Sequence, residues 1–227
     1  MWKLDDTEGV GIFSKATNIQ TLRTGRDLLG IGDYAFYECA SLRGIELADG
    51  ANTIGNYAFA NCVNLEYARF PSNSSIKALG DHVFYNCRSL KQFDMPVAVQ
   101  KVGDSAFEGC TGLETLNLTP NNQHVLLALL GDNVFKNCTA LRSLSFPETY
   151  NAGFDISCVE GCKSLEYIRI PNLGLKVVDK GEFSFADFME QVPREFYFEG
   201  ASDSLIHDIS NMIDILSKNA EKNIFLQ

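Results

Sequence analysis

Basic residues are scarce in this chain: 19 Lys and Arg stand against 29 Asp and Glu, which gives a formal net charge of −10. Proteins that hold nucleic acid need clustered Lys and Arg to meet the phosphates, so the composition argues against nucleic acid as a partner. No apolar run approaches the roughly 20 residues that cross a bilayer, which argues against membrane insertion. Residues 1–8 are polar and acidic, unlike a signal peptide, so an intracellular location is favoured and the cell surface is the alternative.

Side chains in catalytic arrangements are also lacking. The three histidines, His82, His124 and His207, fall at unrelated positions. No nucleophile–base pair, phosphate-binding loop or positioned pair of carboxylates can be recognised around them. We therefore expect no catalytic residue, no metal and no cofactor, and a chain that is not an enzyme. What the sequence does have is 16 Phe against a single Trp, a bias typical of one aromatic position that is used repeatedly.

One motif recurs along the chain: Ile-Gly-Asp/Asn-x-Ala-Phe-x-x-Cys-x-x-Leu, followed by x-x-Ile/Leu-x-Leu/Phe and often by Pro. Six copies begin at Ile31, Ile54, Leu79, Val102, Leu130 and, in degenerate form, Phe154. Their cysteines are separated by 23, 25, 23, 28 and 24 residues: Cys39, Cys62, Cys87, Cys110, Cys138 and Cys162. A period of this length predicts a solenoid, in which copies stack and no single copy is stable alone.

The first half of each copy predicts a turn and a short helix. An acidic or amide residue precedes a helical spacing, as a helix cap does: Asp33, Asn56, Asp81, Asp104 and Asp132. Ala35, Cys39 and Leu42 then follow at i, i+4 and i+7. The glycine before the cap suits a sharp turn: Gly32, Gly55, Gly80, Gly103 and Gly131. One phenylalanine per copy should stack as a spine: Phe36, Phe59, Phe84, Phe107 and Phe135.

The second half of each copy predicts a strand, because apolar residues alternate with mostly polar ones. The apolar pairs are Ile45/Leu47, Ala68/Phe70, Phe93/Met95, Leu116/Leu118, Leu144/Phe146 and Ile168/Ile170. Proline follows most of them and would end the strand, since it lacks the N–H that continues a ladder. Stacked copies would therefore build one parallel sheet.

The segment Ile54-Gly-Asn-Tyr-Ala-Phe-Ala-Asn-Cys-Val-Asn-Leu resembles the BspA-type leucine-rich repeat, whose signature is Ile-Gly-x-x-Ala-Phe-x-x-Cys-x-x-Leu. The resemblance covers about residues 19–200. It implies an α/β solenoid, a right-handed leucine-rich-repeat superhelix with a parallel β-sheet on one face and short helices or turns on the other. It also implies a non-enzymatic binding scaffold, which in some members adheres to host or matrix proteins.

The chain is expected to form one domain in four parts. Residues 1–30 would be an N-terminal cap with a degenerate first repeat, and 31–172 the six repeats. Residues 173–200 would be a degenerate last repeat, in which Val178, Phe183, Ala186 and Met189 fill the Ile, Phe, Cys and Leu positions. The last strand would be Phe196-Tyr197-Phe198, and 201–227 would form a capping helix. The apolar run 125–130 would tuck under the repeats or, less simply, form an exposed contact patch.

The seven cysteines allow a disulfide framework or a zinc site, but neither fits well. The chain is large and its cysteine count is odd, and the repeated cysteines lie one per copy rather than in close pairs. Buried, reduced thiols are the better interpretation, and they favour a reducing compartment. Residues 30–35 fit the Gly-x-Gly-x-x-Ala fingerprint of dinucleotide binding, but this fingerprint requires a strand leading into a long helix. We interpret it as a repeat turn.

The binding site is expected on the concave, open face of the sheet, where the residues between the core positions form two columns. The expected partner-binding residues are Tyr67, Arg69, Gln92, Asp94, Thr115, Asn117, Tyr167 and Arg169. Tyr and Arg are the types most enriched in binding hot spots, although ordinary solvent-facing strand residues would give the same pattern. The hypothesis is a protein-binding scaffold with an unidentified partner. A surface adhesin that binds a matrix protein or glycan is the main alternative, and an enzyme the remote one.

Overall fold

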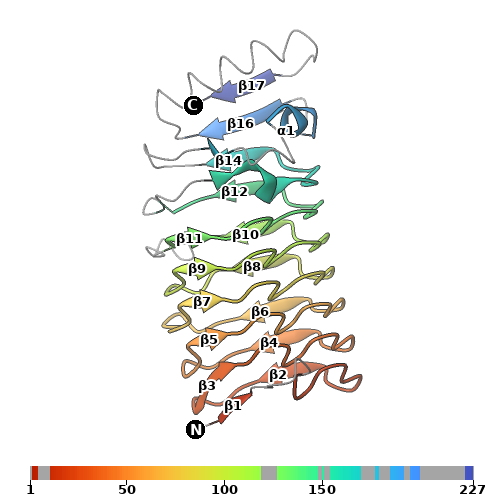
Figure 1. Ribbon diagram of the computed structural model, residues 1–227, viewed down its shortest axis with the longest axis vertical. Helices are drawn as coiled ribbons and strands as arrows, with labels where there is room; N and C mark the ends of the chain where they lie inside the picture. Colours follow the sequence, from red (N-terminus) through yellow and green to blue (C-terminus); the bar gives the residue numbers. More distant parts are fainter. Residues whose placement is uncertain are drawn as a thin grey trace.

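A single stack of coils makes up the computed structural model, with β1 at one end and β17 at the other (Figure 1). The structure describes residues 2–4, 11–118, 127–147, 150, 154–169, 177–178, 185–191, 195–199 and 223–226. Each central coil contains two short strands on two sides of the stack, and all paired strands run parallel. The predicted solenoid is therefore confirmed, but it carries two parallel ladders rather than the one that was predicted.

The strands fall into two series. The first series forms one sheet through the Ile positions: β1 (Trp2–Leu4), β3 (Leu28–Ile31), β5 (Thr53–Ile54), β7 (Ala78–Leu79), β9 (Lys101–Val102) and β11 (Leu129–Leu130). The second series begins with the three-stranded sheet of β2 (Thr21–Arg23), β4 (Gly44–Glu46) and β6 (Tyr67–Arg69). It continues in a six-stranded sheet of β8 (Gln92–Asp94), β10 (Thr115–Asn117), β12 (Ser143–Ser145), β14 (Tyr167–Arg169), β16 (Glu195–Glu199) and β17 (Asn223–Leu226).

Of the short helices or turns expected after the glycine, the structure has turns in the first five copies, and helices are not confirmed there. In these five copies the segment is a run of overlapping turns, with two residues per copy in the left-handed region, for example Tyr34 (φ 55°) and Glu38 (φ 56°). Left-handed residues interrupt an α-helix. Alternate N–H groups point to the next coil instead: Phe36 N–H donates to Ala58 O at 2.8 Å and Glu38 N–H to Ala60 O at 2.9 Å.

In the first four copies, the acidic or amide residue after the glycine bonds to the next coil rather than to its own. Its side-chain oxygen accepts from the backbone of the next coil: Asn56 N–H donates to Asp33 Oδ1 at 2.7 Å, and Asp104 N–H donates to Asp81 Oδ1 at 3.0 Å. These residues therefore form a ladder along the stack. Capping of the predicted kind occurs in the degenerate sixth copy, where Asp155 Oδ1 accepts from Ser157 N–H at 2.9 Å at the start of the 3-10 helix η2 (Ile156–Val159).

The repeated glycine is required by the closeness of neighbouring coils rather than by its own turn. A Cβ added at Gly80 would run into the backbone of Gly55 and would lie 2.6 Å from Asn56 N. Neither glycine is among the residues with positive φ. Because the coils touch here, Gly80 N–H donates to Ile54 O at 2.9 Å.

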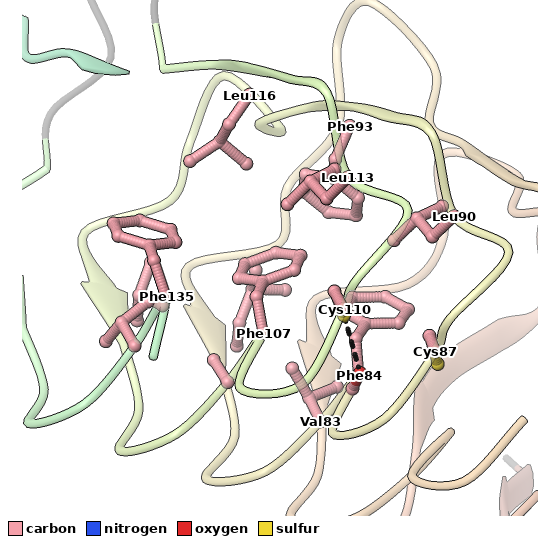
Figure 2. Packing of buried hydrophobic residues seen from close by; sticks show 14 of the residues in the cluster. Val83, Phe84, Cys87, Leu90, Phe93, Phe107, Cys110, Leu113, Leu116 and Phe135 are labelled. Atoms are coloured by element: carbon pink, nitrogen blue, oxygen red, sulfur yellow. Dashed lines mark hydrogen bonds between the residues drawn. The ribbon is translucent and has the colours of Figure 1, made fainter. Parts of the chain in front are cut away.

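Between the two ladders, one phenylalanine per coil stacks on the next. The ring centroids of Phe36 and Phe59 lie 5.4 Å apart, and those of Phe84 and Phe107 also lie 5.4 Å apart. Figure 2 shows Phe84, Phe107 and Phe135 in equivalent places in successive coils. The predicted spine is confirmed, and Phe13 extends it at the N-terminal end, 5.2 Å from Phe36.

All seven cysteines are buried and unpaired. The repeated thiol donates to the carbonyl of the phenylalanine one coil earlier, as Cys110 Sγ does to Phe84 O at 3.1 Å (Figure 2). A small side chain with a weak donor fits this position. Burial raises the pKa of every thiol, to about 12 for Cys110 and Cys162. The thiols are therefore protonated packing groups at neutral pH.

The ends of the stack differ from its middle. At the C-terminal end, Val178 lies in β15 (Val177–Val178), which pairs with β13 (Phe154–Asp155), while the predicted position of Phe183 lies outside the described residues. Here α1 (Phe185–Gln191) is a true α-helix, and Gln191 Nε2 donates to Val159 O at 2.9 Å.

Two further expectations concern residues 201–227 and residues 125–130. The capping helix expected over 201–227 falls outside the described residues as far as 222, and the described residues 223–226 are a strand rather than a helix. Residues Asn223–Leu226 form strand β17, which pairs in parallel with β16. Of the run 125–130, Leu127 is buried, while Leu129 is 56% exposed.

Gly80→Ala should lower the free energy of unfolding by about 1–3 kcal/mol or more, because the added methyl separates two coils that touch. Gly25→Ala is the matched control, since a Cβ there meets nothing within 4 Å; its effect should stay within about 0.5 kcal/mol. Urea denaturation of both variants measures the difference. Equal stability of the two would contradict the close approach at Gly80.

Alkaline conditions should destabilise the fold through the thiols. An exposed thiol has a pKa of about 8.5, and burial raises the pKa of Cys87, Cys110 and Cys138 above that range. Above about pH 8.5 the unfolded chain therefore releases protons that the folded chain keeps, and the free energy of unfolding falls as the pH rises. The fall in the urea midpoint between pH 7 and pH 10 should be smaller in a variant with these three residues replaced by Ala. An unchanged fall would refute the assignment.

Candidate functional site

The strand register places two columns of side chains on the open face of the second strand series. One column runs through Thr21, Gly44, Tyr67, Gln92, Thr115, Ser143, Tyr167 and Tyr197. The other runs through Arg23, Glu46, Arg69, Asp94, Asn117, Ser145 and Arg169. All eight residues expected at the site are in these columns, and each is partly or fully exposed.

Tyr67 has a defined place in its column because its neighbour is glycine. Its ring lies on the backbone of Gly44, where an added Cβ would come 2.6 Å from Tyr67 Cε2. On the same strand, Arg69 Cζ lies 4.4 Å from the centroid of the Tyr67 ring, a cation–π arrangement. The ring is therefore half-buried between backbone and guanidinium, and these two contacts set its orientation.

Glu46 ties this pair to the strand before it. Arg69 Nη1 lies 3.2 Å from Glu46 Oε1, and Arg23 Nε lies 2.9 Å from Glu46 Oε2. Tyr67 Oη also donates to Glu46 Oε1, at 3.5 Å. The two arginines are 68% and 74% exposed, so each ion pair contributes at most about 1 kcal/mol to stability. The main effect of these contacts is on orientation, because the Glu46 carboxylate bonds to Arg23, Arg69 and the Tyr67 hydroxyl across three strands.

The open face is interrupted between β6 and β8. Among the described residues these two strands are not paired, whereas β4 pairs with β6 and β8 with β10. The backbone hydrogen bonds of the residue that follows each strand show the same break. Leu47 N–H donates to Arg69 O at 3.0 Å and Met95 N–H to Asn117 O at 2.9 Å, but within the described chain no such bond joins Phe70 to Asp94.

A change of residue size at the middle strand position accounts for this break. Most strands carry Ile or Leu there, but β6 carries the small Ala68 and β8 the large Phe93. The Phe93 ring packs between the stacked rings, 5.2 Å from Phe84 and 4.8 Å from Phe107, and lies above them in Figure 2. On the other side of the coil, β5 and β7 remain paired, so the two coils separate only at the open face.

A cavity of about 410 Å³ opens at the break. Five of the expected site residues line it: Tyr67, Arg69, Gln92, Asp94 and Asn117. Sequence reasoning missed the rest of its wall, which is formed by Ala68, Phe70, Pro71, Ser72, Met95, Pro96 and Val97. Thr115, Tyr167 and Arg169 share the columns but do not line the cavity, so the structure brings together one group of five and a second, separate pair on β14.

The sequence carried a signal for part of what was missed. Ala68 is the only small residue among the middle strand positions, and Phe93 follows it one copy later. Tyr197, 37% exposed and in register with Tyr167, could have been placed in the column by extending the strand pattern to residues 195–199. On the turn side, Tyr34, Tyr57 and His82 occupy one repeat position and stack, with centroids 4.8 and 4.5 Å apart.

Two kinds of site were searched for within the described residues. No cluster of three or more His, Cys, Asp or Glu side chains there is arranged to hold a metal ion. None of the described helices has the length and apolar character needed to span a bilayer.

Comparison with solved structures identifies the architecture. A leucine-rich repeat protein of T. pallidum is 19% identical, with a TM-score of 0.57; the match covers 88% of this chain and 84% of that one. A leucine-rich repeat protein of Bacteroides ovatus is 20% identical, with a TM-score of 0.51; the match covers 81% of this chain. It covers only 55% of the Bacteroides chain. At this identity the likeness concerns the fold alone. Among curated proteins, none matches the chain in sequence.

The repeat itself decides the family. The signature of the BspA type leucine rich repeat region matches residues 9–128 and 126–195, in six copies. Together these matches span most of the chain, and they include the coils that carry both strand series and the cavity. The chain therefore belongs to the BspA-type leucine-rich repeat family.

Proposed function

We propose that this chain is a protein-binding scaffold whose open strand face receives the partner, centred on Tyr67, Arg69 and the cavity beside them. The observation that carries the proposal is the arrangement of Tyr67: an aromatic side chain at the surface, held between the Gly44 backbone and the Arg69 guanidinium. Tyr and Arg dominate binding hot spots, and they do so in pockets near the middle of an interface.

The size of the face suits this use. Neighbouring strands lie about 4.8 Å apart, so the strands from β2 to β17 extend over roughly 40 Å. The two columns, about 7 Å apart along the strands, cover roughly 550 Å², which is a large part of the about 800 Å² on one side of a standard protein–protein interface. The Tyr67 group and the Tyr167/Arg169 pair on β14 would then be two anchor points for one extended partner.

The fixed orientation of the Tyr67 group supports binding rather than a purely solvated surface. Ordering a flexible side chain on association costs roughly 0.5–1.5 kcal/mol. Arg69 already lies over Tyr67 and is joined to Glu46, so most of this ordering has taken place in the free protein. A scaffold that forms a preordered aromatic–guanidinium pair at the surface can bind without that loss.

Replacing Tyr67, Arg69, Tyr167 and Arg169 together by Ala should abolish recovery of the partner in affinity capture from the source organism, quantified by mass spectrometry. The control is Tyr85→Ala/Arg88→Ala, which removes the same residue types from the turns of one coil. Circular dichroism should show that both variants keep the wild-type fold. Recovery of every protein at wild-type levels by the sheet-face variant would refute the proposed face.

Gly44→Ala tests the orientation of Tyr67 without removing any binding group. The new methyl occupies the space of the Tyr67 ring, so the ring must leave its place. Partner recovery should fall at least severalfold, while Gly25→Ala, with open space around its Cβ, should bind as the wild type does. Full binding by Gly44→Ala would show that the position of the Tyr67 ring is not used.

A further inference from the structure

We propose that the cavity between β6 and β8 receives the side chain of an arginine from an extended segment of the partner, with Asp94 as its counter-ion. This inference rests on the proposed function and adds to it the chemistry of the partner. The observation that supports it is a cavity of about 410 Å³ whose wall contains one carboxylate next to several apolar residues.

The charges around the cavity favour a cation over an anion. On one side of the cavity, Asp94 is exposed and forms no ion pair with any described residue. Arg69, on the other side, is already joined to Glu46 at 3.2 Å and stacked on Tyr67 at 4.4 Å. An incoming carboxylate would have to compete with Glu46, whereas an incoming guanidinium finds Asp94 available.

The whole molecule reinforces this preference. A net charge of −10 draws positively charged segments toward the surface and repels acidic ones. Guanidinium is also the cation best suited to a carboxylate, because two parallel N–H groups can meet its two oxygens. Gln92 lies on the same strand as Asp94 and lines the same cavity, and its side-chain oxygen offers another acceptor.

The remaining wall fits the rest of an arginine side chain. Phe70, Pro71 and Val97 line the cavity, are partly exposed and provide apolar surface for the three methylene groups. The cavity lies within the range of roughly 300–1,000 Å³ that is common for small-ligand sites. At its edge, the Phe70 N–H lacks the bond to the next strand that Leu47 and Met95 make in the described chain, which leaves a donor for a main-chain carbonyl of the partner.

The test uses a defined probe, the peptide acetyl-Gly-Gly-Arg-Gly-Gly-amide, titrated into the full chain and followed by ¹H–¹⁵N NMR. Binding should shift the amides of β6 and β8, and Asp94→Asn should weaken it about tenfold, as expected when a charge-assisted hydrogen bond is lost. Asp27→Asn removes an exposed carboxylate from the first coil and should leave the affinity unchanged. A peptide with citrulline in place of arginine, similar in shape but uncharged, should bind as weakly as Asp94→Asn binds the arginine peptide.

A second variant tests the cavity itself rather than its charge. Ala68→Leu introduces the residue type that β10 and β12 carry at this position, so the fold should be kept while the cavity fills. The arginine peptide should then lose at least tenfold in affinity, with an unchanged circular dichroism spectrum as the control for folding. Binding as tight as that of the wild type would overturn the assignment of the cavity.

The outcomes separate this inference from the proposed function. Equal affinity for the arginine and citrulline peptides, no detectable binding of either, or tighter binding of a peptide with glutamate in place of arginine would overturn the cation site. If the sheet-face variant nevertheless loses its captured partner, the protein-binding face stands and only the occupant of the cavity is wrong. If capture is unaffected by that variant, the proposed function fails whatever the peptides do.

Discussion

The close approach of successive coils at the glycine–aspartate step is the constraint on which the rest of the structure depends. At this step the Gly80 N–H reaches Ile54 O, and the Asp81 N–H reaches the Asn56 side chain at 2.8 Å. Backbone groups that each coil cannot satisfy internally are thereby bonded to the next coil. The stacked phenylalanines and the thiol–carbonyl bonds follow, because both need coils held at one constant spacing.

The same constraint explains why a local opening is tolerated. Between β5 and β7 the step is intact, and the stack from Phe59 to Phe84 is unbroken, with centroids 5.6 Å apart. The other side of the coil can therefore give up its ladder between β6 and β8 without separating the repeats. A repeat protein made of nearest-neighbour interfaces can carry such a defect, since its cost is confined to one interface. The proposed binding site lies at this break in strand pairing between β6 and β8.

Much of the architecture followed from the sequence, and so did the composition of the open face. The period, the phenylalanine spine and the strand after each Leu position were all predicted, because each depends on repeated apolar side chains. The helix predicted from Ala35, Cys39 and Leu42 was not confirmed, because the same spacing also arises in turns with left-handed residues at Tyr34 and Glu38. The spacing of apolar residues alone does not distinguish an α-helix from such a run of turns. An aspartate side chain bonds to backbone N–H groups at helix starts and in turns, so it does not distinguish them either.

By itself the sequence determined which residues repeat, and hence that the copies stack and which side chains share a column. Only the tertiary structure decided that Asp33 serves the next coil, that Tyr67 rests on Gly44, and that β6 and β8 part to form a cavity. The physical reason is distance along the chain. Periodicity reports what each coil buries, whereas these contacts join residues more than 20 positions apart and depend on how closely neighbouring coils approach.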